Sequence, residues 1–316
     1  MTSGAEGTGR TGDTGDRWRL ARSLAEVGRD VRAVLGEPAG PADAEVVRTE
    51  GGDDVFGVDA RAEDRLVESL RRRCGDRWPG TLVIEGYAEP LAVGDPGGPW
   101  CYLADPVDGS RPWMWAKRSA YVLLGAGSEA RTLDDLEVGA CVELPTPRAA
   151  LALTAWAVRG EGFEAVDDIV AVESVARPAT LEPLEGGLLD HSFVTVARYA
   201  IGTKAAIGAW EDAVLDGLTV YEDNYICSGG LLVEVAAGRQ AAVLDPRPLV
   251  VPGSMATHPY DLAAWVVAAE AGVIVEALAG GPLTAPLDTT TAVAWAAYAN
   301  EEIAVELRAR VARASA

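Results

Sequence analysis

Two aspartates three residues apart, Asp105 and Asp108, follow a short apolar run and could together bind a metal ion. The run Cys101–Leu103 suits a buried strand, and Pro106, which has no N–H, is expected to end that strand. Gly109 permits the tight turn that follows. Neighbouring carboxylates repel each other and lose hydration when buried, and a hard cation such as Mg²⁺ relieves both costs. The alternative is a polar turn that carries two solvated aspartates.

Other acidic residues stand where they could join this pair. Glu85 directly follows the apolar run Thr81–Ile84 and comes 20 residues before Asp105. If the two strands are neighbours, their ends bring these carboxylates together. Asp59 and Glu63, four residues apart in the first turn of an expected helix, share one face of that helix. Alternatively, they only interact favourably with the helix dipole.

Three further candidates lie in the C-terminal half of the chain. Ser228 opens a Ser-Gly-Gly helix start whose free N–H groups could hold a phosphate, although such starts are common. Asp245 ends the apolar strand Gln240–Leu244. Asp261 precedes the expected helix Leu262–Glu270, where helix capping alone would also explain it.

Composition and charge restrict the class of protein. The chain has 316 residues, 49% of them hydrophobic, which is enough for one large domain or two medium ones. A net charge of −21 argues against nucleic-acid binding, although a small phosphate held through a metal is compatible with it. With only 2 histidines, a His-rich zinc site is nearly excluded. The 4 cysteines form no CxxC motif and are expected to be buried and reduced.

The termini and the apolar runs predict a protein of the cytoplasm. Residues 1–16 are rich in Gly, Thr, Ser and Asp and lack the apolar core of a signal peptide, so we expect a disordered tail. No apolar run reaches the length of about 18 residues that a membrane span requires. No membrane contact is therefore expected.

Apolar periodicity predicts helices and strands in an order that favours a sheet packed under helices. The expected helices are Arg17–Gly36, Asp59–Arg73, Leu262–Glu270 and Glu301–Val311, and the stretch Tyr225–Val235 is expected to enter a helix after Cys227–Gly230. The expected strands are Thr81–Ile84, Cys101–Leu103, Ala120–Gly125, Gly139–Leu144, Leu151–Val158, Phe193–Tyr199, Gln240–Leu244 and Val273–Glu276. Val46–Val58 is expected to form a hairpin or an irregular loop, and Asp167–Asp190 to form loops.

Taken in order, these pieces resemble the inositol monophosphatase/fructose-1,6-bisphosphatase superfamily, in particular its archaeal bifunctional phosphatases. The resemblance covers about residues 17–310 and rests on DARAED, VIEG, DPVDGS, SGGLLVEVAAGRQAAVLD and HPYDLAAWVVAAEAGVIV. It implies an α/β fold, a layered α-β-α-β-α sandwich. The sandwich would have an N-terminal half with the metal loop, residues 17–175, and a C-terminal half with substrate contacts, residues 176–316. A homodimer is also implied.

The resemblance further implies a magnesium-dependent phosphomonoesterase for a small sugar or polyol phosphate. The metal ligands, for two or three Mg²⁺ ions, would be Glu85, Asp105, Asp108, Asp261 and the Val107 carbonyl. The catalytic residues would be Asp59, Glu85 and Ser110, with Asp59 and Ser110 positioning the attacking water. The substrate-binding residues would be Asp108, Gly109, Ser110, Ser228 and Asp245, with amides of the loop on the phosphate and Asp245 facing the alcohol.

The chain departs from the family pattern at several positions. Gly86 stands where the second of two adjacent acids is usual, and Glu89 could compensate for it. Arg48 takes the approximate place of a family lysine. The bulky Arg111–Trp115 segment should reshape access or substrate choice, although its tryptophans could equally be local core or a dimer contact. The acidic segment Tyr221–Asn224 counts against a bisphosphate substrate.

Two other functions remain compatible with the sequence. A homologue that has lost its activity could serve as a binding or scaffold protein. A 3′-phosphonucleotide phosphatase of the same superfamily is also possible. Phosphate release measured with and without Mg²⁺ separates the first of these from an active phosphatase, and an adenosine bisphosphate substrate tests the second.

Overall fold

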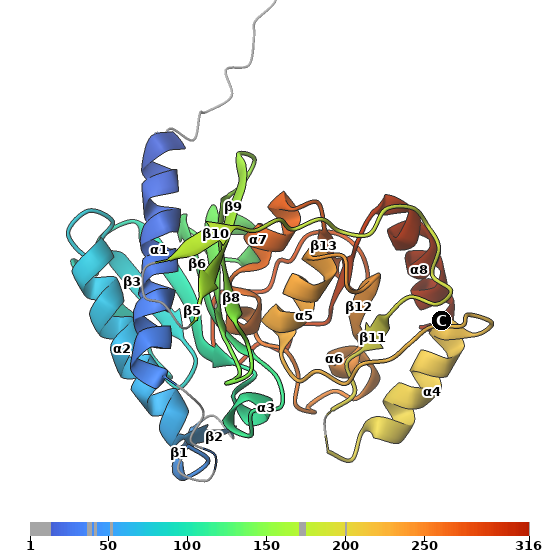
Figure 1. Cartoon of the computed structure of the whole chain (residues 1–316). Helices are drawn as coiled ribbons and strands as arrows, with labels where there is room; N and C mark the ends of the chain where they lie inside the picture. The colour runs from blue at the N-terminus through green and yellow to red at the C-terminus, as the bar shows by residue number, and fades with distance from the viewer. Residues whose placement is uncertain are drawn as a thin grey trace, which may run out of the picture.

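The protein stacks helices and sheets in five alternating layers, α-β-α-β-α, as the family resemblance predicts (Figure 1). This computed structural model describes residues 14–36, 40, 43–50, 53–170, 175–199 and 201–315. Most of the expected N-terminal tail lies outside these residues. The expectation is wrong for Thr14–Asp16, which begin helix α1, because Asp16 accepts a hydrogen bond from the Trp78 indole at 2.9 Å.

Two helices form the first layer, α1 (Thr14–Leu35) and α2 (Gly57–Cys74). Their apolar residues recur at helical spacing, and α1 buries Leu20, Leu24, Val27 and Val31. In Figure 1 both helices lie along the same face of the large sheet. The two expected helices are confirmed, and each extends slightly beyond the range that the sequence predicts.

The large sheet has eight strands in the order β10-β9-β8-β7-β6-β5-β3-β4. Only β3 and β5 run parallel, and their pairing confirms that the two strands with acidic ends are neighbours. A separate hairpin, β1 (Val46–Glu50) with β2 (Asp53–Phe56), confirms the hairpin expected there, although its Gly51 and Gly52 lie outside the described residues. The strands of the large sheet are β3 (Gly80–Ile84), β4 (Leu91–Val93), β5 (Trp100–Asp108), β6 (Ala120–Ser128), β7 (Val138–Leu144), β8 (Leu151–Val158), β9 (Gly162–Ile169) and β10 (Ala176–Pro178).

Strand β5 continues through Pro106, so the expectation that this proline ends the strand is wrong. Asp105 pairs with Leu123 of β6, and Asp108 pairs with Tyr121, so β5 has one residue more than β6 between the two pairs. This is a β-bulge, where a residue without an N–H is tolerated. Residues three apart on a regular strand point to opposite faces, and the extra residue removes that alternation. The bulge therefore lets both aspartates face the same side.

The remaining layers come mostly from the C-terminal half. Helices α5 (Ser228–Ala236) and α7 (Trp265–Glu270) lie between the large sheet and a second sheet of order β11-β12-β14-β13, and α4 and α8 cover its far side (Figure 1). The other elements are β11 (Val194–Val196), α4 (Lys204–Leu215), β12 (Ala242–Asp245), β13 (Ile274–Ala277), β14 (Trp295–Tyr298), α8 (Glu301–Ala314), the short helices α3 (Ser110–Met114) and α6 (Arg247–Val250), and the 3-10 turns η2 (Leu133–Asp135) and η3 (Pro259–Leu262).

The sequence prediction missed elements in the middle of the chain. Helix α4 was not predicted, although Ile207, Trp210 and Val214 are buried at helical spacing. Strands β9 and β10 extend into the stretch expected to be loops, and no β9 residue is fully buried, so its apolar signal is weak. The helix expected over Leu262–Glu270 is instead η3 followed by α7.

Two clusters of buried apolar residues hold the layers together. One lies between the α1–α2 pair and the large sheet, and the other joins the large sheet to the second sheet through α5 and α7. All four cysteines are free thiols, and the expectation that they are buried is confirmed for Cys74, Cys141 and Cys227, whereas Cys101 is half-buried. Within the described residues, no helix combines the length and the apolar character that crossing a bilayer requires.

The same glycine substitution should have opposite effects at two positions in this fold. A Cβ on Gly80 of β3 would lie 1.8 Å from the Trp100 carbonyl oxygen of β5, so Gly80→Ala should lower the free energy of unfolding by about 3 kcal/mol. A Cβ on Gly208 of α4 would meet no described atom within 4 Å, so Gly208→Ala should raise it by about 1 kcal/mol. Urea denaturation followed by circular dichroism measures both. Equal stability of the two variants would contradict the β3–β5 packing.

Candidate active site

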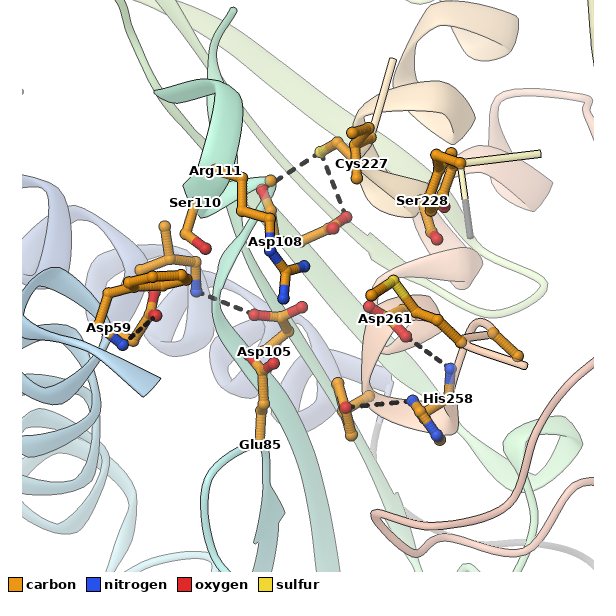
Figure 2. Close-up of a pocket in the computed structure, with 18 of the residues that line it drawn as sticks. Asp59, Glu85, Asp105, Asp108, Ser110, Arg111, Cys227, Ser228, His258 and Asp261 are labelled. Atoms are coloured by element: carbon orange, nitrogen blue, oxygen red, sulfur yellow. Dashed lines mark hydrogen bonds between the residues drawn. The ribbon is translucent and has the colours of Figure 1, made fainter. Parts of the chain in front are cut away.

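The carboxyl ends of β3 and β5 form the floor of a pocket. Parallel pairing places Ile84 beside Ala104, so the next residues, Glu85 just after β3 and Asp105 within β5, stand side by side. The Glu85 amide also donates to the Ala104 carbonyl at 3.2 Å, which extends the pairing by one residue. Figure 2 shows Glu85, Asp105 and Asp108 converging on the same space. The structure thus brings together three of the predicted ligands.

A fourth predicted ligand, Asp261, reaches this group from the other half of the chain. It lies in η3, which packs against β5, and its Oδ2 accepts a hydrogen bond from the His258 amide at 2.6 Å. One carboxylate oxygen each from Asp105, Asp108 and Asp261 lie within 4.8 Å of one another. Asp261 therefore does not cap the expected helix, since α7 begins at Trp265; it closes the first turn of η3 instead, and the same carboxylate also belongs to the acidic cluster.

Burial and mutual repulsion shift the protonation of these acids. Asp105 is 2% exposed and Asp108 is 6% exposed, which rules out the polar turn with two solvated aspartates. Loss of water, followed by the charges of the neighbouring carboxylates, raises the pKa values of Glu85, Asp105 and Asp261 well above their ordinary range. Loss of water also raises the pKa of Asp108, to about 6, although amide donors oppose the shift.

Those donors come from the start of helix α5. The Gly229 amide and the Cys227 thiol both donate to Asp108 Oδ2, the thiol at 3.3 Å, and the Gly230 amide donates to Cys227 Sγ at 3.2 Å. The expectation that free N–H groups here could hold a phosphate is therefore wrong, because Asp108 and Cys227 already use two of them. Ser228 lines the pocket wall with its hydroxyl 3.1 Å from that of Thr257.

Asp59 lies on the opposite wall, at the start of α2. Its Oδ2 accepts a hydrogen bond from the Phe56 amide at 3.0 Å, which is a capping role. Its Oδ1 is buried and finds no hydrogen-bond partner among the described residues. Burial raises the pKa of Asp59 to about 6, although Arg111 and the Ser110 hydroxyl oppose the shift. A role at the start of the helix, which was the alternative for Asp59, thus accounts for one oxygen only, and the other is available to a water or a ligand.

Glu63, on the same face of α2, lies beside Gly86. A Cβ on Gly86 would be 2.4 Å from Glu63 Oε1 and 2.7 Å from an Arg48 nitrogen. Arg48 forms an ion pair with Glu63 and donates to the Gly86 carbonyl at 3.0 Å. Burial raises the pKa of Glu63 to about 7. Glu89 is exposed and outside the pocket lining, so the carboxylate nearest to Gly86 comes from α2 instead.

Asp245 does not reach the pocket as the sequence suggested. It is 0% exposed, and its two oxygens accept hydrogen bonds from the Arg247 guanidinium at 2.8 and 2.6 Å. Arg247 itself lines the pocket, and its guanidinium also donates to the Tyr199 hydroxyl at 3.1 Å. Sequence reasoning missed Arg247 as a pocket residue, although it stands two positions after the acidic strand end.

The pocket opens to solvent, so a ligand can reach the acids that line it. The acidic segment at its side is neutralised, since Glu222 pairs with Arg198 and Asp223 pairs with Arg118, and neither acid is among the described lining residues. These acids therefore give no reason to expect that a second anionic group on the substrate would be repelled.

Of the two tryptophans expected to be core or contact residues, Trp113 is buried and Trp115 is 57% exposed.

These residues fit a bound Mg²⁺ ion on three counts. The donors are carboxylate oxygens, which Mg²⁺ prefers, and Val107, whose carbonyl is the other predicted ligand, also lines the pocket. The acids are close enough to repel one another strongly unless protons or cations compensate. Asp59 adds a buried oxygen that finds no partner among the described residues.

The chain is similar in structure to several solved proteins, at low sequence identity. No protein-family model and no curated protein matches the chain. SuhB from Mycobacterium tuberculosis is similar at 21% identity, covering 96% of this chain and 98% of that one, with a TM-score of 0.63. An inositol monophosphatase from Anabaena matches at 17% over 94% and 97% of the two chains, with a TM-score of 0.64. A putative sedoheptulose-1,7 bisphosphatase from Toxoplasma gondii matches at 14% over 96% of each chain, with a TM-score of 0.69.

These likenesses define the class of fold. The chain has the fold of the inositol monophosphatase/fructose-1,6-bisphosphatase superfamily, as its sequence motifs predict.

Proposed function

We propose that this chain is a magnesium-dependent phosphomonoesterase that hydrolyses a small sugar or polyol phosphate of the inositol type. The observation that supports this most strongly is the gathering of Asp105, Asp108 and Asp261 within 4.8 Å in one pocket, where Asp105 and Asp108 are buried. Glu85 and Asp59 stand beside them, as electrostatic neighbours of the cluster. The fold adds support, because similar solved structures carry the names of phosphatases.

Under this proposal, Glu85, Asp105, Asp108, Asp261 and the Val107 carbonyl would hold two or three Mg²⁺ ions. When bound, the ions would lower the pKa of the attacking water and stabilise the charge on the leaving oxygen. Glu85 would also act in catalysis by keeping Asp105 in place, since it stands beside Asp105, whose pKa is raised first by burial and then by the Glu85 charge. The Gly229 amide and the Cys227 thiol, which both donate hydrogen bonds to Asp108, would keep its carboxylate oriented.

The chain's other residues would handle water and substrate. Asp59 Oδ1 and the Ser110 hydroxyl would orient the attacking water, since both line the pocket at the start of α2 and α3. Amides of Gly109 and Ser110 would bind phosphate oxygens. Ser228 would line the wall that receives the alcohol portion, and Asp245 would act there only through Arg247, which it orients.

A panel assay tests the proposal. Phosphate release is measured from inositol phosphates, sugar phosphates, sugar bisphosphates and adenosine 3′,5′-bisphosphate, with Mg²⁺ or with EDTA. We expect Mg²⁺-dependent release from at least one sugar or polyol ester. Release from the adenosine bisphosphate alone would favour the nucleotide phosphatase, and no release from any ester would favour the inactive binding protein.

We also propose a homodimer and a division into two halves near residue 175, both from the family resemblance. Sedimentation equilibrium gives the mass of the particle in solution and so tests the homodimer. Expression of residues 14–175 alone tests the division into halves, and an unfolded product would show that the halves depend on the shared apolar cluster.

A further inference from the structure

Two guanidinium groups line the pocket among its carboxylates, and they differ in accessibility. Arg247 is 1% exposed and is surrounded by Asp245, Tyr199, Thr257 and the Met255 carbonyl, all within 3.2 Å of its nitrogens. Arg111 is exposed to solvent at the other wall. Arg111 is therefore accessible to a ligand that enters from solvent, whereas Arg247 is buried.

Helix α3 holds Arg111 at this wall. The helix follows Gly109, whose φ of 88° allows the chain to turn out of β5. Trp113 is completely buried and its indole donates to the Pro145 carbonyl at 3.1 Å, and Met114 is 2% exposed. The bulky residues after the aspartate loop thus anchor the short helix to the protein core, and they fix the backbone that carries Arg111.

The Arg111 side chain is directed towards the acids. Its guanidinium carbon lies 5.9 Å from the centre of the Phe56 ring, and its charge acts on Asp59. Figure 2 shows this side chain extending into the pocket among Asp59, Asp105 and Asp108. A phosphate monoester carries negative charge into the same space, where five carboxylates line the walls. A fixed cation there reduces the repulsion that the substrate meets.

We propose that Arg111 is a phosphoryl-binding residue, whose guanidinium donates hydrogen bonds to the oxygens of the phosphate group on the solvent side of the metal cluster. This inference rests on the proposed phosphatase function and names a contact that this function does not require. A planar guanidinium presents paired N–H donors that match two phosphate oxygens, which an ammonium cannot do. In the Arg111–Trp115 segment, the arginine then binds the phosphate group of the substrate, and the buried Trp113 and Met114 hold that arginine in position.

Three variants of the full-length protein test this assignment: Arg111→Gln, Arg111→Lys and the control Arg148→Gln, which changes an exposed arginine in the loop after β7. Each is loaded with Mg²⁺ and titrated with inorganic phosphate by calorimetry. Kinetic constants are measured with the best ester of the panel, and the Mg²⁺ concentration for half-maximal activity is recorded. Thermal melting shows whether each variant is folded.

For Arg111→Gln we expect the dissociation constant of inorganic phosphate and the KM of the ester to rise about 10- to 100-fold. Arg111→Lys should recover part of the loss, Arg148→Gln should match the parent, and the Mg²⁺ requirement should stay within about twofold. Unchanged phosphate affinity in Arg111→Gln would overturn the assignment, as would an equal loss of Mg²⁺ affinity. If the parent hydrolyses no ester but binds phosphate through Arg111, the proposed function fails and the assignment stands. If the parent hydrolyses esters and Arg111→Gln behaves like it, only the assignment fails.

Discussion

Asp105→Asn is expected to lower kcat/KM for phosphate release at least about 1,000-fold. Asp105 is 2% exposed, and one of its oxygens lies within 4.8 Å of ligand atoms from both Asp108 and Asp261, so it is central to the proposed metal site. Replacing a residue that only orients a metal ligand lowers metal affinity or activity about 10- to 100-fold, and replacing a ligand itself should lower the activity further. Asparagine keeps the shape of the side chain and can still accept the 2.9 Å hydrogen bond from the Val107 amide.

The same variant should be more stable than the parent when metal is absent. The substitution removes a buried acid that must either carry a repelled charge or hold a proton against the surrounding pH, so at pH 8 in EDTA we expect a gain of roughly 2 kcal/mol in the free energy of unfolding. Thermal melting with and without Mg²⁺, beside the kinetic assay, measures both effects. Asp95→Asn, in an exposed loop, is the matched control and should change neither. An Asp105→Asn protein that keeps its activity, or that melts earlier in EDTA, would contradict this account of the cluster.

Without metal, the protein should lose stability as the pH rises from 5 to 8. Burial raises the pKa of Asp108 to about 6, and burial with neighbouring carboxylates raises those of Glu85, Asp105 and Asp261 well above their usual range. Burial also raises the pKa values of Asp59 and Glu63, to about 6 and about 7, so both act in the same direction. The folded state then holds protons that the unfolded state has already released near pH 4, and the stability that this supplies disappears as the pH passes through the folded pKa values. A shift of about 2 pKa units in one group corresponds to about 3 kcal/mol, or roughly 5 °C in Tm.

Bound Mg²⁺ should reverse this trend. Metal ligands must be deprotonated, so the stabilisation by Mg²⁺ grows with pH and should be near zero at pH 5. Melting curves at pH 5 to 8, with EDTA or 10 mM MgCl₂ at equal ionic strength, measure the difference. Asp16, Asp30 and Asp168, whose pKa values are lowered by partner groups, affect stability only below about pH 4 and stay outside this window. A metal-free Tm that rises from pH 5 to 8, or an Mg²⁺ effect that is equal at both ends, would be incompatible with the cluster.

The sequence determined which residues are available for this chemistry and much of the framework that carries them. The apolar spacing of α1 and α2, and the apolar runs of β3, β6, β7 and β8, are local signals because each element buries its own regular face. Acids at the ends of apolar runs were equally visible, and their order along the chain indicated the superfamily fold. Weak signals, as in half-buried β9, were missed because no regular face is buried there.

Only the tertiary structure decided how those acids are arranged. A bulge beside Pro106, which depends on pairing with β6, turns Asp105 and Asp108 to the same side. The contacts of each acid depend on the folded chain. Helix α5 supplies donors to Asp108, Glu63 of α2 reaches the space beside Gly86, and the Arg247 guanidinium binds the Asp245 carboxylate. These contacts depend on how the helices and sheets pack, because the partner of each acid comes from another element of the fold. No local pattern of residue types contains that information.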